Sequence, residues 1–139
     1  MSEQNKAIMR RFYEEVFNRG NLTVAEDVFA TDFIEHEIFP GMAPGLEGFK
    51  QMVSAARAAF TDFRVSADDM LAEGDKVAVR YTTSGTHRGG FVGVAPTGKR
   101  VTLTGIDINR FTGGKIVEHW GQSDSLGLMQ QLGLVPSMG

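Results

Sequence analysis

Residues 101–122 of the chain read VTLTGIDINRFTGGKIVEHWGQ, and this segment predicts a β-hairpin. β-branched and aromatic residues recur through residues 101–111, as is typical of a strand, and Thr112-Gly113-Gly114 supplies the turn. Residues 115–122 form the returning strand. The segment therefore predicts two antiparallel strands, because a tight turn joins antiparallel neighbours.

Two further strands are expected before this hairpin. Residues 64–73 and residues 77–87 both have a period of two, and Gly74-Asp75 lies between them as a turn. A glycine-rich loop or bulged hairpin over residues 89–98 then leads to residue 101. The second half of the chain is therefore expected to form consecutive hairpins.

The first part of the chain has the period of helices instead. In chain order, the sequence predicts a helix containing Ile8, Phe12 and Val16, a helix from Thr23, a short strand within residues 33–39, and a helix over about residues 47–60. A last short helix is expected over residues 125–132. Helices followed by hairpins indicate an α+β fold with a bent sheet, one face of which is covered by the N-terminal helices.

The composition is that of one globular domain spanning residues 1–139. Apolar residues make up 42% and charged residues 22%, and the ten Phe and seven Met predict a soft, phenylalanine-rich interior. The formal charge of −3, without a basic stripe, argues against a nucleic-acid partner. The absence of cysteine excludes disulfides, a thiolate nucleophile and a cysteine-based zinc site.

The sequence also gives expectations about location. The N-terminal residues 1–6 lack the apolar stretch of a signal peptide, and no apolar run approaches the length of a membrane span. We therefore expect a soluble cytoplasmic protein without a membrane partner.

Most familiar catalytic motifs are missing from the sequence. Residues 121–125, GQSDS, begin like a nucleophile elbow but lack its closing glycine. The three histidines are far apart in sequence, and neighbours in the extended segment Glu35-His36-Glu37 point to opposite faces. We expect no metal site and no serine nucleophile, which leaves acid/base chemistry by a carboxylate.

Asp124, directly after the last strand, is the first candidate for that carboxylate. By strand parity Trp120, Gln122 and Asp124 share a face with Ile116 if no bulge intervenes. A carboxyl beside a large aromatic ring in a partly apolar cavity would have a raised pKa suited to proton transfer. The alternative is that Asp124 caps the final helix, since Asp is a preferred N-cap residue.

Other polar residues have two interpretations each. His36 is either a pocket residue or a partly exposed residue at a strand end. Asp107 shares parity with Val101 and Phe111, so it lies either on an otherwise apolar face or on a bulge that turns it outward. His87 and His119 are expected at the surface or a sheet edge.

Several segments together resemble the SnoaL-like polyketide cyclases. The resemblance covers nearly the whole chain and is carried by residues 12–18 (FYEEVFN), 20–22 (GNL), 32–36 (DFIEH), 45–48 (GLEG), 85–87 (GTH), 105–111 (GIDINRF), 114–120 (GKIVEHW) and 124–133 (DSLGLMQQLG). Each segment is short, but their order along the chain is specific.

This resemblance implies a cone-shaped α+β barrel of the nuclear-transport-factor-two-like superfamily. Its strongly bent mixed or antiparallel sheet would wrap around a pocket that the N-terminal helices cover. Family cyclases are dimers or larger oligomers, and they close a ring by intramolecular aldol condensation without metal or organic cofactor. We therefore expect a homodimer or higher homo-oligomer with no cofactor.

The resemblance also assigns roles to residues. Asp124 would be the acid/base in ring closure of a small apolar or aromatic carbonyl compound, with His36 and Tyr13 as donors. Trp120, Asp107 and His87 would contact the substrate. Two other functions remain open: a non-catalytic binding or dimerisation module, and an epoxide-hydrolase-like or isomerase activity in the same pocket.

Overall fold

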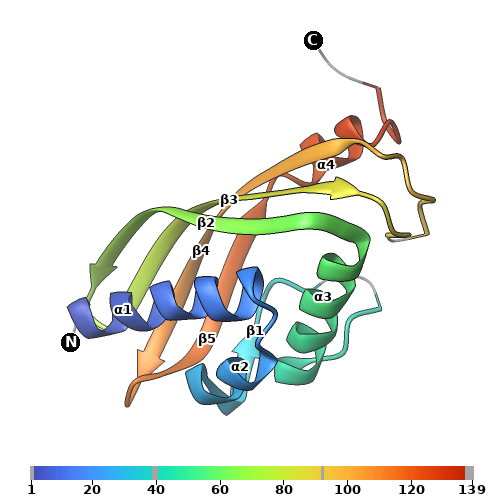
Figure 1. Ribbon diagram of the computed structural model, residues 1–139. Coiled ribbons are helices and arrows are strands. Elements are labelled where there is room, and N and C mark those ends of the chain that lie inside the picture. Colours follow the sequence, from blue (N-terminus) through green and yellow to red (C-terminus); the bar gives the residue numbers. More distant parts are fainter. Residues whose placement is uncertain (1, 39–40, 92, 137–139) are drawn as a thin grey trace.

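The computed structural model describes residues 2–38, 41–91 and 93–136 (Figure 1). Its helices are α1 (Ser2–Phe12), the π-helix η1 (Tyr13–Asn18), α2 (Leu22–Val28), α3 (Gly45–Ala59) and α4 (Ser125–Gln131). Its strands are β1 (Phe29–Glu35), β2 (Phe60–Glu73), β3 (Lys76–His87), β4 (Arg100–Thr112) and β5 (Lys115–Ser123).

The predicted elements are present, with differences at their ends. The strand expected within residues 33–39 is β1 and begins earlier, at Phe29; residues 39 and 40 lie outside the described part of the chain. The first strand expected after the third helix, β2, begins at Phe60 rather than at residue 64. The first helix changes to π-helical geometry at Tyr13, where the pattern predicted one continuous α-helix.

The five strands form one mixed sheet in the order β1-β5-β4-β3-β2. Strands β2 to β5 are consecutive antiparallel neighbours, as the hairpins predicted. Strand β1 pairs parallel with β5, a long-range pairing that no turn signal announces. In the described residues β1 and β2 are the two edges, so strand pairing does not close the sheet into a barrel.

The sheet is strongly bent, and β2 shows one cause. Its pairing with β3 changes register between Thr61 and Arg64 and again between Ala67 and Asp69. Such bulges bend a strand and increase its twist. Figure 1 shows β2, β3 and β4 curving over the helices, with α1, α2 and α3 on one side of the sheet.

The main core fills the space between these helices and the concave face of the sheet. Met9, Val16 and Val53 from the helices and Val77 and Ile116 from the sheet are completely shielded from solvent. A cluster of phenylalanine rings packs among them: Phe12, Phe29, Phe33 and Phe49. The predicted phenylalanine-rich interior is therefore present.

A smaller core lies beneath α4. Leu128 and Leu132 pack with Phe60 and Val101, at the end of the sheet away from the N-terminus (Figure 1). Across the described residues, the helices are too short or too polar for any of them to cross a membrane.

Candidate active site

A buried carboxylate lies at the centre of the concave face. Asp107 is on β4 between Gly105 and Asn109, which share its face, and it is 9% exposed. Its Oδ2 accepts a hydrogen bond of 3.0 Å from the Tyr13 hydroxyl, and its Oδ1 accepts one of 3.2 Å from Asn109 Nδ2. Burial first, and the charge of Asp107 second, raise the pKa of Tyr13, so this phenol remains a donor.

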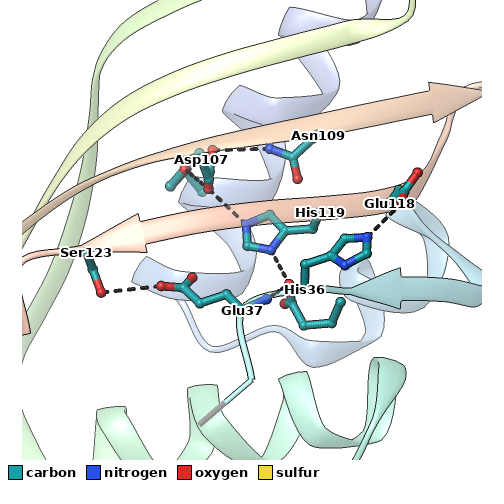
Figure 2. Close-up of polar contacts among 9 residues, drawn as sticks. His36, Glu37, Asp107, Asn109, Glu118, His119 and Ser123 are labelled. Carbon is teal, nitrogen blue, oxygen red and sulfur yellow. Dashed lines mark hydrogen bonds and ion pairs between the residues drawn. The ribbon is translucent and has the colours of Figure 1, made fainter.

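His119, on β5, joins this carboxylate to a second one. Its Nε2 lies 3.4 Å from Asp107 Oδ2, and its Nδ1 contacts a carboxylate oxygen of Glu35 on β1 (Figure 2). Burial lowers the pKa of His119, but the hydrogen bonds to Asp107 and Glu35 and their charges outweigh it and raise the pKa to about 10. The imidazole is therefore protonated at neutral pH and donates from both nitrogens.

A third carboxyl group, that of Glu37, completes the cluster. Its Oε2 accepts a hydrogen bond of 3.3 Å from Ser123 Oγ, and its backbone N–H donates to Glu35 Oε2 at 3.3 Å (Figure 2). Burial raises the pKa of Glu37, and repulsion from Glu35 and Asp107 adds to this effect, while His119 opposes it. We call Tyr13, Glu35, Glu37, Asp107, Asn109, His119 and Ser123 the interior polar cluster.

A depression of about 380 Å³ lies over β3, β4 and β5 and is lined mainly by residues of the outer face of the sheet. It is lined by Arg80, Tyr81, Thr82, Thr104, Gly105, Ile106, Gln122, Ser123 and Asp124. Ser123 is one of these lining residues, and its hydroxyl donates to Glu37 on the concave side. Burial raises the pKa of Tyr81, and the nearby charge of Glu37 adds to the rise, so this hydroxyl also remains protonated.

Asp124 caps α4. It is exposed, and its Oδ1 accepts a hydrogen bond of 2.9 Å from the backbone N–H of Gly127. This is the N-cap contact that the sequence offered as the alternative to a catalytic role.

Asp124 and Trp120 do not share a face with Ile116, contrary to the prediction from strand parity. The β4–β5 pairing changes register between Arg110 and Phe111, so β5 has opposite parity on the two sides of this irregularity. As a result His119 faces the cluster on the concave side, and Trp120, opposite Ile108, faces the outer side. We had expected His119 at the surface or at a sheet edge, and this expectation is wrong.

His36 and Trp120 lie together on the outer face of the sheet. Their rings stack with centroids 5.1 Å apart, and the His36 side chain is 42% exposed. His36 Nε2 lies 2.7 Å from Glu118 Oε2, and Arg110 Nε donates to the other oxygen of that carboxylate at 3.0 Å. The structure therefore separates His36 and Trp120 from Tyr13 and Asp107, with which they were grouped.

His87 is buried, not at the surface. Its ring lies 5.3 Å from that of Phe60, and Nδ1 lies 3.0 Å from Thr97 Oγ1. In the described part of the chain its buried Nε2 has no hydrogen-bond partner. His87 belongs to the region of the smaller core and makes no hydrogen bond to the interior polar cluster.

Epoxide-hydrolase chemistry in this fold would need an Asp–Arg–Asp group, here Asp107, Arg110 and Asp124, and this group is not formed. Arg110 bonds to Glu118 on the outer face, whereas Asp107 bonds to Tyr13, Asn109 and His119 on the concave face. Among the described residues there is also no group of three or more His, Cys, Asp or Glu placed to hold a metal ion.

Glu35, Glu37 and His119 were not among the candidates from the sequence. The alternation within Glu35-His36-Glu37 already indicated that the two glutamates share one face of the strand, but it did not indicate whether that face is concave or outer. His119 could be recognised as a residue of the concave face only if the register irregularity in β5 was known.

Solved structures share this fold. The structure of TsrD from Streptomyces laurentii matches with a TM-score of 0.88 and 27% identity, covering 97% of this chain and 98% of that one. The expected α+β cone is therefore confirmed, with an open mixed sheet.

Two relatives have names that describe an activity. The aklanonic acid methyl ester cyclase AcmA of Streptomyces galilaeus is 32% identical and covers 96% of this chain and 92% of its own length. The nogalonic acid methyl ester cyclase of Streptomyces nogalater is 28% identical over 119 residues, which are 84% of this chain and 89% of that protein. Residues 7–132 match the family model described as SnoaL-like polyketide cyclase, so the chain belongs to this family.

Proposed function

We propose that this protein is a cofactor-free cyclase that closes a ring in a polyketide ester by intramolecular aldol condensation. The observation that carries the proposal is the buried contact of His119 with Asp107, to which Tyr13 also donates. It places an imidazolium and a phenol beside carboxylates on the concave face of a cyclase-family fold. The names of the two curated relatives support the substrate class.

The reaction needs a base, an acid, and hydrogen-bond donors that stabilise an enolate. A carboxylate removes a proton from a methylene flanked by carbonyls, and the enolate carbon attacks an internal carbonyl to form the new C–C bond. The protonated carboxyl then returns its proton to the alkoxide. Because such a C–H is already acidic, positioning and electrostatic stabilisation account for most of the acceleration.

His119 and Tyr13 are the donors that we assign to the enolate oxygen. Asp107 holds both in place before the substrate binds, and each exchanges its hydrogen bond to Asp107 for one to the enolate oxygen. Donors held in a region shielded from water stabilise developing negative charge strongly. The positive charge on His119 is thus the electrostatic component of this mechanism.

The structure favours the helix-cap role for Asp124. Its carboxylate is exposed and accepts a hydrogen bond from Gly127 N, so it lacks the buried, partly apolar surroundings that the acid/base role was expected to have. For His36 and Trp120 we propose a role at an interface, because both lie on the outer face of the sheet.

That outer face fits a second copy of the chain. Leu71, Ala78, Ile108 and Trp120 form a row of paired positions across four strands. Leu71 is 71% exposed, Ile108 is 39% exposed, and the neighbouring Ile106 is 54% exposed. Exposed apolar patches of this kind mark interaction sites, and we propose that this one forms a homodimer.

The direct test is turnover of the relatives' substrates. The protein is incubated with nogalonic acid methyl ester and with aklanonic acid methyl ester, with and without EDTA. The ring closure keeps the new hydroxyl and loses no water, so the mass is unchanged and the product is identified by chromatographic retention and NMR. We expect conversion that EDTA does not affect; no conversion of either ester, or conversion only with added metal, would contradict the proposal.

A non-catalytic binding module is the second candidate. The observation that favours it is the aromatic packing in the cone, where Phe12 contacts Tyr13, Phe17 and Phe49. Such packing leaves less room for a substrate to reach Tyr13. Binding of either ester in calorimetry, without conversion, would support this function over the cyclase.

A further inference from the structure

Glu37 is the carboxyl group of the interior polar cluster with the most unused hydrogen-bonding capacity. Asp107 already accepts from Tyr13 and Asn109 and contacts His119, and Glu35 contacts His119 and accepts from the backbone N–H of Glu37. Within the described residues, the Glu37 carboxyl accepts one hydrogen bond, from Ser123, and this bond involves only Oε2. Oε1 is therefore available to take a proton.

The absence of a side chain at position 121 makes room for this carboxyl. Gly121 pairs with Asp107 and lies between His119 and Ser123 on β5, so its missing side chain would point to the concave face. A Cβ there would lie 2.9 Å from the Glu37 carboxyl carbon and closer still to Oε1. Glycine in a strand interior often marks such a close approach, and here the approaching group is a carboxyl.

The path of the chain holds Glu37 in this position. Beyond the end of β1, the backbone N–H of His36 still donates to the carbonyl of His119 at 2.9 Å. The extended path therefore continues beside β5 for one more residue, and Glu37 points to the same side as Glu35. Figure 2 shows the Glu37 carboxyl directed toward Ser123, whose hydroxyl donates to it.

We infer that Glu37 is the acid/base group of the ring closure, an assignment that rests on the proposed function. Its carboxylate takes the methylene proton, which leaves the enolate beside the donors His119 and Tyr13. After the new C–C bond has formed, the same carboxyl gives that proton to the alkoxide, so no proton or electron is gained or lost overall. Burial and the neighbouring carboxylates raise the pKa of Glu37, which suits both steps.

The test is the change of carboxyl to amide at three positions. Glu37→Gln is expected to lower kcat by about 10²–10⁴-fold, the usual contribution of a general base. It is also expected to remove the acidic limb of the kcat/KM–pH profile. Glu118→Gln, on the outer face, is the matched control and is expected to keep both. Asp124→Asn removes the other candidate base while keeping a residue that caps helices well, so a comparison with Glu37→Gln shows which carboxylate is the base.

A second pair of variants tests the geometry without relying on one substitution. Gly121→Ala keeps every titratable group but displaces the Glu37 carboxyl, so kcat is expected to fall while circular dichroism stays unchanged. Adding Gly121→Asp to Glu37→Ala puts a carboxyl back into the same space, and we expect it to restore part of the lost kcat.

The outcomes separate this assignment from the proposed function. Inactivity of the unmodified protein on both esters would remove the proposed function and, with it, the role of Glu37. An active protein in which Glu37→Gln keeps its rate and its acidic limb would overturn the assignment alone. So would a loss of activity in Asp124→Asn that Glu37→Gln does not share.

Discussion

The replacement of His119 by glutamine is expected to be among the most destabilising single changes in this protein. The His119 side chain is 15% exposed and lies between those of Glu35 and Asp107, which as side chains are 5% and 11% exposed. The variant leaves these carboxylates buried without their cation. Removing one partner of a buried ion pair typically costs about 3–5 kcal/mol of unfolding free energy.

The pKa of His119 leads to a similar figure. One pKa unit corresponds to about 1.4 kcal/mol, so a rise from 6.5 to about 10 corresponds to about 5 kcal/mol. Since domains of this kind are stable by about 5–15 kcal/mol, the loss would be a large part of the total.

The same pKa fixes the direction of the pH dependence. The folded-state pKa of His119 lies above its unfolded value, so the stabilisation is fully present below pH 6.5 and is lost as pH rises through about 10. The difference in stability between wild type and His119→Gln is therefore expected to shrink over this range.

Urea denaturation followed by circular dichroism, repeated at several pH values in this range, measures both effects. His36→Gln is the matched control, because this histidine also contacts a carboxylate but is 42% exposed on the outer face. Exposed pairs contribute about 0–1 kcal/mol. Equal losses in the two variants, or a difference that does not change with pH, would refute the assignment of His119 as a buried imidazolium.

Three further predictions test other parts of the structure. Asp124→Ala removes the hydrogen bond to Gly127 N and should cost about 1 kcal/mol in urea denaturation, and no loss would contradict the cap. Ile116→Ala, at a fully buried position, should cost about 2–5 kcal/mol by the same assay, and a smaller loss would show that the core can collapse around the cavity. Ile106→Asp, on the exposed outer face, should turn a dimer into a folded monomer in size-exclusion chromatography with light scattering. A dimer that survives this change would place the interface elsewhere.

Much of the fold could be predicted because its signals are local. The turns at Gly74-Asp75 and Thr112-Gly113-Gly114 fixed the hairpins, and the periods of two and 3.6 separated strands from helices. Parity with apolar neighbours gave Asp107 a place on an apolar face as one of two alternatives, and the structure shows that it is buried there. These signals need only residues close together in the chain.

The sequence did not predict which β5 side chains lie on the concave face of the sheet and which lie on the outer face. One irregularity between Arg110 and Phe111 exchanges the faces of His119 and Trp120, and it has no distinctive residue pattern. The parity of β5 therefore pointed to Trp120 and Asp124, while the structure brings His119 to the carboxylates.

The sequence by itself determined the order of the elements, the apolar faces that build the core, and the family resemblance that the comparisons confirmed. Only the tertiary structure decided which polar groups meet. Glu35 and His119 are separated by 84 positions and come together through the parallel pairing of β1 with β5. Such a pairing is selected by the burial of whole faces against the helices, and a change of register by one residue would direct every side chain of a strand to the other face.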